Sequence, residues 1–215
     1  MIKYLIFDMD GTILDSERFS YGCFKEVFAS HGADCREEYY RRIIGTTRPL
    51  TKQILKEIFG DSIDIEKALQ EITALELEKY EAGATIPVKK GYFELREYMK
   101  QHGIEAALAT STRREKAERK LVHNGVGLGF SHMICGDEVT HGKPHPEIYQ
   151  SIMKEIPASS EEVFVLEDSP NGVRSAHAAG LRVIMIPDMV APDKEIEGML
   201  YGKAEDLGKV ISYLK

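Results

Sequence analysis

The chain has 215 residues, which is enough for one sizeable core domain and a smaller companion. Its 43% hydrophobic and 29% charged residues are ordinary for a globular protein, and no run approaches the ~18 apolar residues of a membrane span. The net charge of −7 argues against nucleic-acid binding, which requires concentrated positive charge. We therefore expect neither a membrane protein nor a nucleic-acid binder.

The N-terminus and the cysteines indicate a cellular location. The apolar start reaches Asp8 too soon for a signal peptide, and no small-residue cleavage site follows. Cys23, Cys35 and Cys135 are far apart and form no Cys-x-x-Cys pair, so they predict neither a disulfide framework nor a structural zinc site. We expect a cytoplasmic protein, and a monomer.

The first predicted element is a buried strand over 3–7, and two carboxylates follow it. Asp8 and Asp10 would lie at its carboxyl end, where ligands bind in open parallel sheets. Alternation along an extended chain would put both on one side, with Met9 facing away. The alternative is a surface turn that merely ends the strand. An EF-hand is excluded, because its glycine is the sixth loop residue and Gly11 would be the fourth.

The next segment, 15–86, is polar and helix-periodic and has no convincing strand. Four glycines divide it into three or four expected helices: Gly32, Gly45, Gly60 and Gly83. We interpret it as an all-helical cap domain inserted into a core made of 1–14 and 87–215. The crossings near Asp15 and over 83–90 would be hinges.

Strands and helices alternate after the insertion. Apolar runs predict further strands at 105–109, 132–135, 163–166 and 182–186. Three- and four-residue spacing predicts helices at 91–102, 113–124, 146–154, 171–179 and 206–214. The alternation predicts an α/β fold with a doubly wound, Rossmann-like parallel sheet.

Further polar groups follow the later strands. Glu167 and Asp168 come after the strand at 163–166, and Ser169 with Pro170 then opens a helix, so helix capping is the plain alternative role for these acids. Thr110 and Ser111 follow the strand at 105–109.

Two further features bear on an anionic ligand. Thr112 and Glu115 match a capping box, which would direct backbone amides toward an anion. Lys143 precedes a helix, where a lone loop lysine is more often solvated, but it could project a charge into the site.

Charge balance predicts a metal. Converging carboxylates repel one another, and a phosphate oxygen about 3.5 Å from a carboxylate adds roughly 5 kcal/mol of repulsion at an effective dielectric constant near 20. Oxygen ligands without nearby His or Cys favour Mg²⁺. The charges of Asp8, Glu167 and Asp168 would balance Mg²⁺ and Lys143 if Asp10 carried a proton.

These residues form an ordered set of motifs that resembles the haloacid dehalogenase superfamily, in its subgroup with a helical cap after the first strand. The motifs are Asp8-Met9-Asp10-Gly11-Thr12 with Asp15-Ser16-Glu17, then Leu108-Ala109-Thr110, then Lys143-Pro144, then Leu166-Glu167-Asp168-Ser169 with Gly172. Four motifs in order are far more specific than any one. The resemblance covers the whole chain and implies a phosphatase acting on a small phosphorylated metabolite, with a sugar phosphate as the best class.

The resemblance also implies roles. Asp8 would attack phosphorus and form an aspartyl-phosphate, while Asp10 protonates the leaving alcohol and then activates water. The metal ligands would be the Asp8 carboxylate, the Asp10 backbone carbonyl and Asp168, with Glu167 in or beside the shell. Thr110, Ser111 and Lys143 would hold the phosphoryl group. The second aspartate, Asp10, argues against dehalogenation.

A β-phosphoglucomutase-like phosphomutase is the nearest alternative. Those mutases carry a histidine where this chain has Ser20, which favours a phosphatase. The resemblance marks four residues as candidates for substrate binding: Glu17, Gly45, Arg48 and Arg113. For Arg48, a solvated helix charge is the alternative.

Three other kinds of function agree less well with the sequence. A signalling receiver domain, which also pairs acids and Mg²⁺ with Thr and Lys, is shorter, lacks a cap and carries its phosphoacceptor on a middle strand. His141 and His145 are four residues apart, but Gly142 and Pro144 prevent the helical face that a zinc pair would use, so we set this pair aside. The glycine-rich runs at 125–129 and 136–143 miss nucleotide-binding spacings by one residue.

Overall fold

The computed structural model describes residues 1–44, 46 and 48–215. The chain divides into two compact units: unit 1 comprises Met1–Asp15 and Pro87–Lys215, and unit 2 comprises Ser16–Ile86. We expected the insertion to begin at Asp15, which the structure assigns to unit 1.

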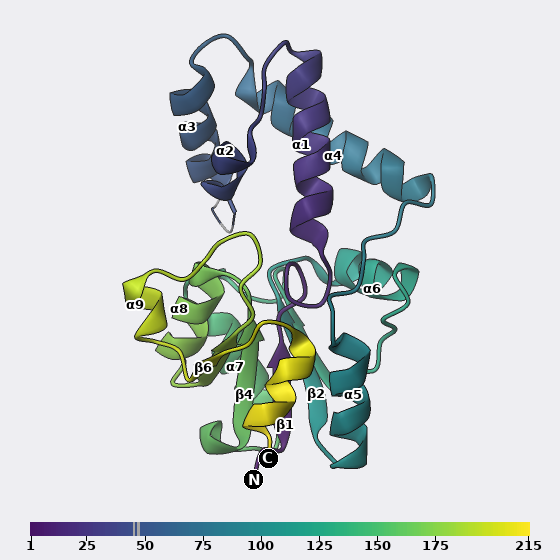
Figure 1. Cartoon of the computed structure of the whole chain (residues 1–215), viewed down its shortest axis with the longest axis vertical. Coiled ribbons are helices and arrows are strands. Elements are labelled where there is room, and N and C mark those ends of the chain that lie inside the picture. Colours follow the sequence, from purple (N-terminus) through teal and green to yellow (C-terminus); the bar gives the residue numbers. More distant parts are fainter. Residues whose placement is uncertain (45, 47) are drawn as a thin grey trace. The chain divides into compact units, whose positions relative to one another are not determined.

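Unit 1 is built on a parallel sheet, in which the described residues form six strands in the order β3-β2-β1-β4-β5-β6 (Figure 1). The strands are β1 (Tyr4–Phe7), β2 (Glu105–Thr110), β3 (His132–Cys135), β4 (Val163–Glu167), β5 (Arg182–Met185) and β6 (Gly202–Lys203). This order is that of doubly wound sheets, so the predicted fold class is confirmed. The short edge strand β6 was not predicted.

Helices connect these strands. They are α5 (Tyr92–Gln101), α6 (Arg114–His123), α7 (Glu147–Glu155), α8 (Pro170–Ala178) and α9 (Lys194–Glu197), with the 3₁₀ helices η1 (Ser160–Glu162) and η2 (Leu207–Tyr213). The helix expected over 206–214 is thus of the tighter 3₁₀ type, and Gly208 in its first turn disfavours an α-helix.

Strand alternation buries both faces of the sheet. Ile6 of β1 packs in a cluster with Tyr149 of α7 and Val173 of α8. Its neighbour Phe7 points to the other face, where its ring contacts Tyr92 of α5 edge-on at 6.0 Å between centroids. Burial on both sides explains why the strands are continuous apolar runs.

The two segments that lead to the insertion pair with each other inside unit 1. The Asp15 N–H donates to the Pro87 carbonyl and the Lys89 N–H donates to the Ile13 carbonyl, each at 2.8 Å. That these crossings act as hinges stays a prediction.

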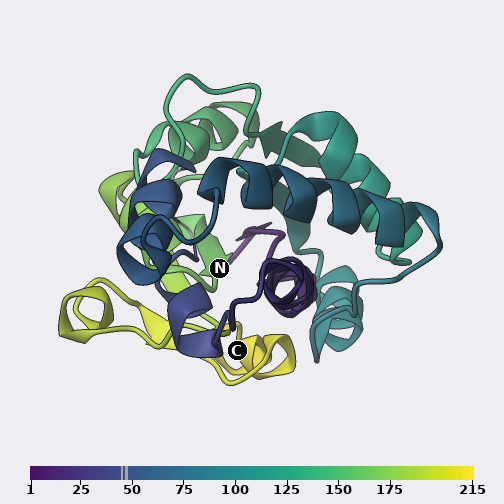
Figure 2. The same cartoon turned by 90° about the horizontal axis from the view of Figure 1, so that it is seen from above.

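Unit 2 consists of α1 (Ser16–Ser30), α2 (Glu37–Arg41), α3 (Arg48–Phe59) and α4 (Ile65–Glu81), with no strand among its described residues. Helix α1 is seen end-on in Figure 2, while α4 runs across the view, so the two cross steeply. Aromatic contacts join the helices, such as Phe24 with Tyr40 at 5.0 Å and Phe28 with Phe59 at 4.7 Å between ring centroids. In the part of the chain that is described, no helix combines the length and apolar character that crossing a membrane requires.

Candidate active site

A buried ammonium joins the carboxyl ends of three neighbouring strands. The Lys143 Nζ donates to Asp8 Oδ1 and Glu167 Oε1 at 2.6 Å each, and to the Ala109 carbonyl at 3.0 Å. Asp8 directly follows β1, Ala109 lies in β2 and Glu167 ends β4. The Lys143 side chain is 7% exposed, so this lysine is not the solvated loop residue that a lone lysine usually is.

Glu167 is held from several sides. Its Oε1 also accepts a hydrogen bond from the Tyr149 hydroxyl at 2.6 Å, and its Oε2 accepts one from the Ser169 hydroxyl at 3.2 Å. Ser169 in turn accepts from the Gly172 N–H at 3.1 Å, which confirms Ser169 as N-cap of α8 with Pro170 in its first turn. Both Glu167 oxygens are thus engaged by protein donors.

Asp168 completes a group of three carboxylates. Asp8, Glu167 and Asp168 each offer an oxygen, and these oxygens lie within 4.8 Å of one another. The Thr12 hydroxyl orients Asp168 by donating to its Oδ1 at 3.0 Å. Gly11 has φ +83° and lies so close that a Cβ there would be 2.2 Å from Asp168 Oδ2, so this turn requires glycine.

The charges of this cluster explain its protonation. Burial raises the pKa of Asp8 to about 8, and the neighbouring Glu167 adds to the rise while Lys143 opposes it. Burial alone would lower the pKa of Lys143, but the Asp8 and Glu167 carboxylates outweigh it and hold that pKa well above its ordinary value. Lys143 therefore stays charged, and Asp8 retains its proton near neutral pH unless a further cation arrives.

The donor set fits a hard divalent cation. Three carboxylates facing one ammonium leave two negative charges uncompensated when all are ionised. Carboxylate oxygens without imidazole or thiolate are the ligands that Mg²⁺ prefers. Bound there, Mg²⁺ would compensate both charges.

Asp10 has hydrogen-bond partners of its own. The Lys120 Nζ of α6 donates to its Oδ1 and the Thr112 hydroxyl to its Oδ2, both at 2.6 Å. Lys120 thus places a positive charge beside Asp10, and the two bonds orient its carboxyl group. The predicted capping box of Thr112 and Glu115 is wrong, because Arg113 is the N-cap of α6 and Thr112 bonds Asp10 instead.

Thr110 and Ser111 lie at the same edge of the sheet. Thr110 is buried at the end of β2, and its Oγ1 accepts from the Thr112 N–H at 3.1 Å. This bond orients the hydroxyl while leaving its proton to donate to an anion. Ser111 is exposed, and its carbonyl lies against Gly136, where a Cβ would be 2.0 Å from the oxygen.

The residues expected to bind substrate are not brought together in one described cluster. Glu17, in α1, accepts from the Tyr40 hydroxyl at 2.9 Å. Arg48 begins α3 and bonds Glu66 Oε1 at 3.1 Å. Arg113 is exposed in unit 1. The fourth candidate, Gly45, lies outside the described residues. Their roles stay predictions.

Three residues of this site were missed by sequence reasoning. Lys120, Thr12 and Tyr149 bond Asp10, Asp168 and Glu167 across 110, 156 and 18 residues of sequence. Thr12 had a weak signal, since it is a hydroxyl next to the first acidic pair. Lys120 and Tyr149 had none, because their approach depends on how α6 and α7 are rotated against the sheet.

We expect Gly172→Ala to weaken Mg²⁺ binding by about ten- to a hundredfold, the usual cost of disturbing a group that supports metal ligands. Although alanine favours a helix, its Cβ at position 172 would lie 2.0 Å from both Glu167 oxygens, so Glu167 must move. Calorimetric titration with Mg²⁺ measures the effect. Gly22→Ala is the control, because a Cβ there meets nothing within 4 Å. Unchanged Mg²⁺ affinity in Gly172→Ala would show that Glu167 does not support the metal site.

Known proteins resemble this chain in sequence and in fold. The chain is 33% identical over 183 residues to the phosphorylated carbohydrates phosphatase of Thermotoga maritima, covering 85% of this chain and 84% of that protein. Among solved structures, a putative β-phosphoglucomutase of Thermotoga maritima has a TM-score of 0.79 at 27% identity, with 99% and 98% of the two chains covered. CbbY from Rhodobacter sphaeroides in complex with phosphate has a TM-score of 0.75 at 28% identity, with 98% and 96% covered.

A family model spans most of the chain and includes all four motifs. It matches residues 5–186, from β1 to the end of β5, under the description haloacid dehalogenase-like hydrolase. The resemblance inferred from the motifs is thereby confirmed. The chain belongs to the haloacid dehalogenase-like hydrolase family.

Proposed function

We propose that this enzyme is a Mg²⁺-dependent phosphatase that hydrolyses a small phosphomonoester, a sugar phosphate, through an aspartyl-phosphate on Asp8. The observation that carries the proposal is the buried Lys143 that bridges Asp8 and Glu167, with Asp168 beside them. Such a site offers a nucleophile, a cation for a phosphoryl oxygen and ligands for a metal. The sugar-phosphate class rests on the name of the Thermotoga maritima phosphatase.

The proposed reaction has two displacements at phosphorus. In the first, an Asp8 oxygen forms a bond to phosphorus, the bond to the leaving oxygen breaks, and Asp10 gives that oxygen a proton. In the second, Asp10 takes a proton from water, the water oxygen bonds to phosphorus, and the bond to Asp8 breaks, which releases phosphate. Thr110, Ser111 and Lys143 hold the phosphoryl oxygens throughout.

The metal site of this proposal uses the same strand ends. The carboxylates of Asp8 and Asp168 and the backbone carbonyl of Asp10 would hold Mg²⁺, which neutralises charge on the phosphoryl group. Since both Glu167 oxygens already accept protein hydrogen bonds, we place Glu167 beside the metal ligands, where it orients Lys143.

We propose a phosphatase rather than a phosphomutase. Ser20 occupies the position at which the resembling mutases carry a histidine, and its hydroxyl donates to Glu76 Oε1 at 2.6 Å. The receiver-domain reading is set aside because the chain belongs to a hydrolase family. A monomeric state and a cytoplasmic location remain predictions.

A panel of phosphomonoesters assayed with Mg²⁺ tests the proposed function. Wild type should release phosphate from a sugar phosphate, and Asp8→Asn should not. Equal release by both proteins would contradict the proposal. Addition of a hexose 1-phosphate with a bisphosphate primer should give phosphate and no 6-phosphate isomer, whereas the isomer would identify a mutase.

Lys120→Met is expected to lower kcat by about ten- to a hundredfold, with little change in KM. This is at or below the lower limit of the roughly hundredfold to ten-thousandfold that acid–base catalysis contributes, because Asp10 itself remains. Its ammonium holds the Asp10 carboxylate at 2.6 Å, so its loss leaves the acid–base group less well placed. Lys120→Arg should retain most of the activity, because arginine also donates to a carboxylate. Lys116→Met, at an exposed position one turn earlier in α6, is the control. If Lys120→Met had the same kcat as wild type, Lys120 would have no role in positioning Asp10.

A further inference from the structure

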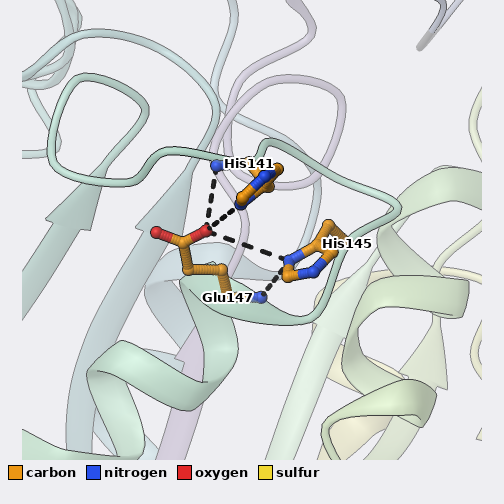
Figure 3. Close-up of side chains that lie close together, drawn as sticks. All are labelled: His141, His145 and Glu147. Carbon is orange, nitrogen blue, oxygen red and sulfur yellow. Dashed lines mark hydrogen bonds and ion pairs between the residues drawn. The ribbon is translucent and has the colours of Figure 1, made fainter.

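His141, His145 and Glu147 form a cluster outside the carboxylate site, on the loop between β3 and α7 and at the start of α7 (Figure 3). The Nδ1 of His141 is 2.8 Å from Glu147 Oε2, and the Nδ1 of His145 is 3.9 Å from the same oxygen. The ligand atoms of all three residues lie within 4.8 Å of one another. None of these residues has a part in the proposed phosphatase reaction.

A turn brings the two histidines together. The His145 N–H donates to the Gly142 carbonyl at 3.1 Å, which folds the loop back on itself. The two imidazole rings then lie 4.6 Å apart between centroids, at an interplanar angle of 36°. We had excluded this pair because Gly142 and Pro144 prevent a helical face. The two histidines do lie outside a helix, but the loop brings their rings together without one.

Glu147 is oriented by the backbone. Its Oε1 accepts from the Thr140 N–H at 2.7 Å, and its Oε2 accepts from the His141 N–H at 2.9 Å. These hydrogen bonds, with that from the His141 ring, hold the carboxylate beside both imidazoles. A carboxylate has about four acceptor positions, which leaves room for a metal bond.

The spacing suits a transition metal. Two ligand atoms that each lie about 2.1 Å from a tetrahedral metal ion are about 3.4 Å from each other. This separation falls between the 2.8 Å and 3.9 Å that separate the two histidine Nδ1 atoms from Glu147 Oε2. Two imidazoles and one carboxylate are a known zinc ligand set, which leaves a position for solvent. The His141 and His145 side chains are 62% and 50% exposed, so an ion can reach them. We propose that His141, His145 and Glu147 form a second metal site, which binds Zn²⁺ or a similar divalent transition ion.

Occupancy of this site would restrain the loop that carries Lys143. Lys143 lies between the two histidines in sequence, and its ammonium bonds Asp8 and Glu167. A metal that ties His141 and His145 to the first turn of α7 fixes both ends of this short segment. Because the metal binds the folded loop, it should raise the thermal unfolding temperature.

Zn²⁺ titration and Cu²⁺ spectroscopy test the proposal on the full chain in excess Mg²⁺. We expect His141→Asn and His145→Asn each to weaken binding of one Zn²⁺ by at least about tenfold, the smaller of the losses seen when even a supporting group is removed. Bound Cu²⁺ should show nitrogen hyperfine coupling in its electron paramagnetic resonance spectrum, which a carboxylate site cannot give. Zn²⁺ should raise the unfolding temperature of wild type and not of the two variants.

Matched controls separate this site from general histidine binding. His177→Asn changes an exposed histidine of α8, and Glu155→Gln changes an exposed glutamate at the other end of α7 from Glu147. Both should bind Zn²⁺ as wild type does, while Glu147→Gln should bind it more weakly. The proposal is overturned if His141→Asn and His145→Asn retain wild-type affinity, or if bound Cu²⁺ shows oxygen ligands only. Each result is independent of whether the enzyme proves to be a phosphatase.

Discussion

Lys143→Met is expected to lower kcat/KM by at least about a hundredfold, the loss found when one donor to a developing charge is removed from an active site. Methionine keeps the length of the side chain and removes the ammonium that bonds Asp8, Glu167 and the Ala109 carbonyl. Without this positive charge, the carboxylates repel the phosphoryl group more strongly during its transfer. Steady-state kinetics with Mg²⁺ on the best substrate of the panel measure the effect.

The same variant has an expected effect on folding. Removing one partner of a buried ion pair usually costs about 3–5 kcal/mol, since the other charge stays buried without compensation. Denaturant unfolding of the metal-free protein should therefore show lower stability, and Mg²⁺ should restore part of it. Lys154→Met, at the exposed end of α7, serves as control and should change neither property. Full activity in Lys143→Met would contradict the assigned role of Lys143.

Asp8→Asn is expected to abolish turnover and, without metal, to stabilise the fold at alkaline pH. The folded pKa of Asp8 is raised to about 8, whereas an unfolded Asp titrates near 3.9. Between these values the folded state binds more protons than the unfolded state, so stability falls as pH rises from about 4 to about 8. Asparagine cannot ionise, so the variant should lose this slope and exceed wild type by on the order of a few kcal/mol near pH 8.

Denaturant unfolding of both proteins in chelator, across this pH range, measures the difference. The exposed Asp61 provides the control variant Asp61→Asn, whose pH dependence should follow wild type. Mg²⁺ should stabilise wild type more than Asp8→Asn at alkaline pH, because ionised Asp8 is one of the proposed ligands. If the stabilities of wild type and Asp8→Asn changed equally between pH 4 and 8, Asp8 would not be buried as described.

The fold and the strand-end chemistry could be predicted because both depend on local patterns. The apolar runs that predicted strands correspond to β1 through β5, with ends that differ by at most one residue. Since parallel strands end at one edge, placing Asp8, Thr110 and Glu167 at strand ends was enough to place them together. The helix start at Ser169 was predictable for the same local reason.

The remaining features depend on contacts between distant parts of the chain. Whether Lys120 points to Asp10 or to solvent depends on how α6 is rotated about its axis. The spacing of apolar residues does not determine this rotation precisely enough. The sequence around Thr112 matched a helix cap, but its hydroxyl donates to the distant Asp10 carboxylate and Arg113 is the N-cap of α6. The strand β6 and the helix α9 are too short to show a period. The contact of His141 with His145 arises in an irregular loop, to which helical spacing does not apply.

We expect Asp8 to become covalently phosphorylated during turnover. Wild type should be mixed with its best substrate and Mg²⁺, quenched rapidly in acid and treated with borohydride, which reduces an aspartyl-phosphate to homoserine. Mass spectrometry of the peptide that contains Asp8 and Asp10 then locates the change. We predict homoserine at position 8 with Asp10 unmodified, and no homoserine in the Asp8→Asn variant. Phosphate release with an unmodified Asp8 peptide, or homoserine at position 10, would contradict it.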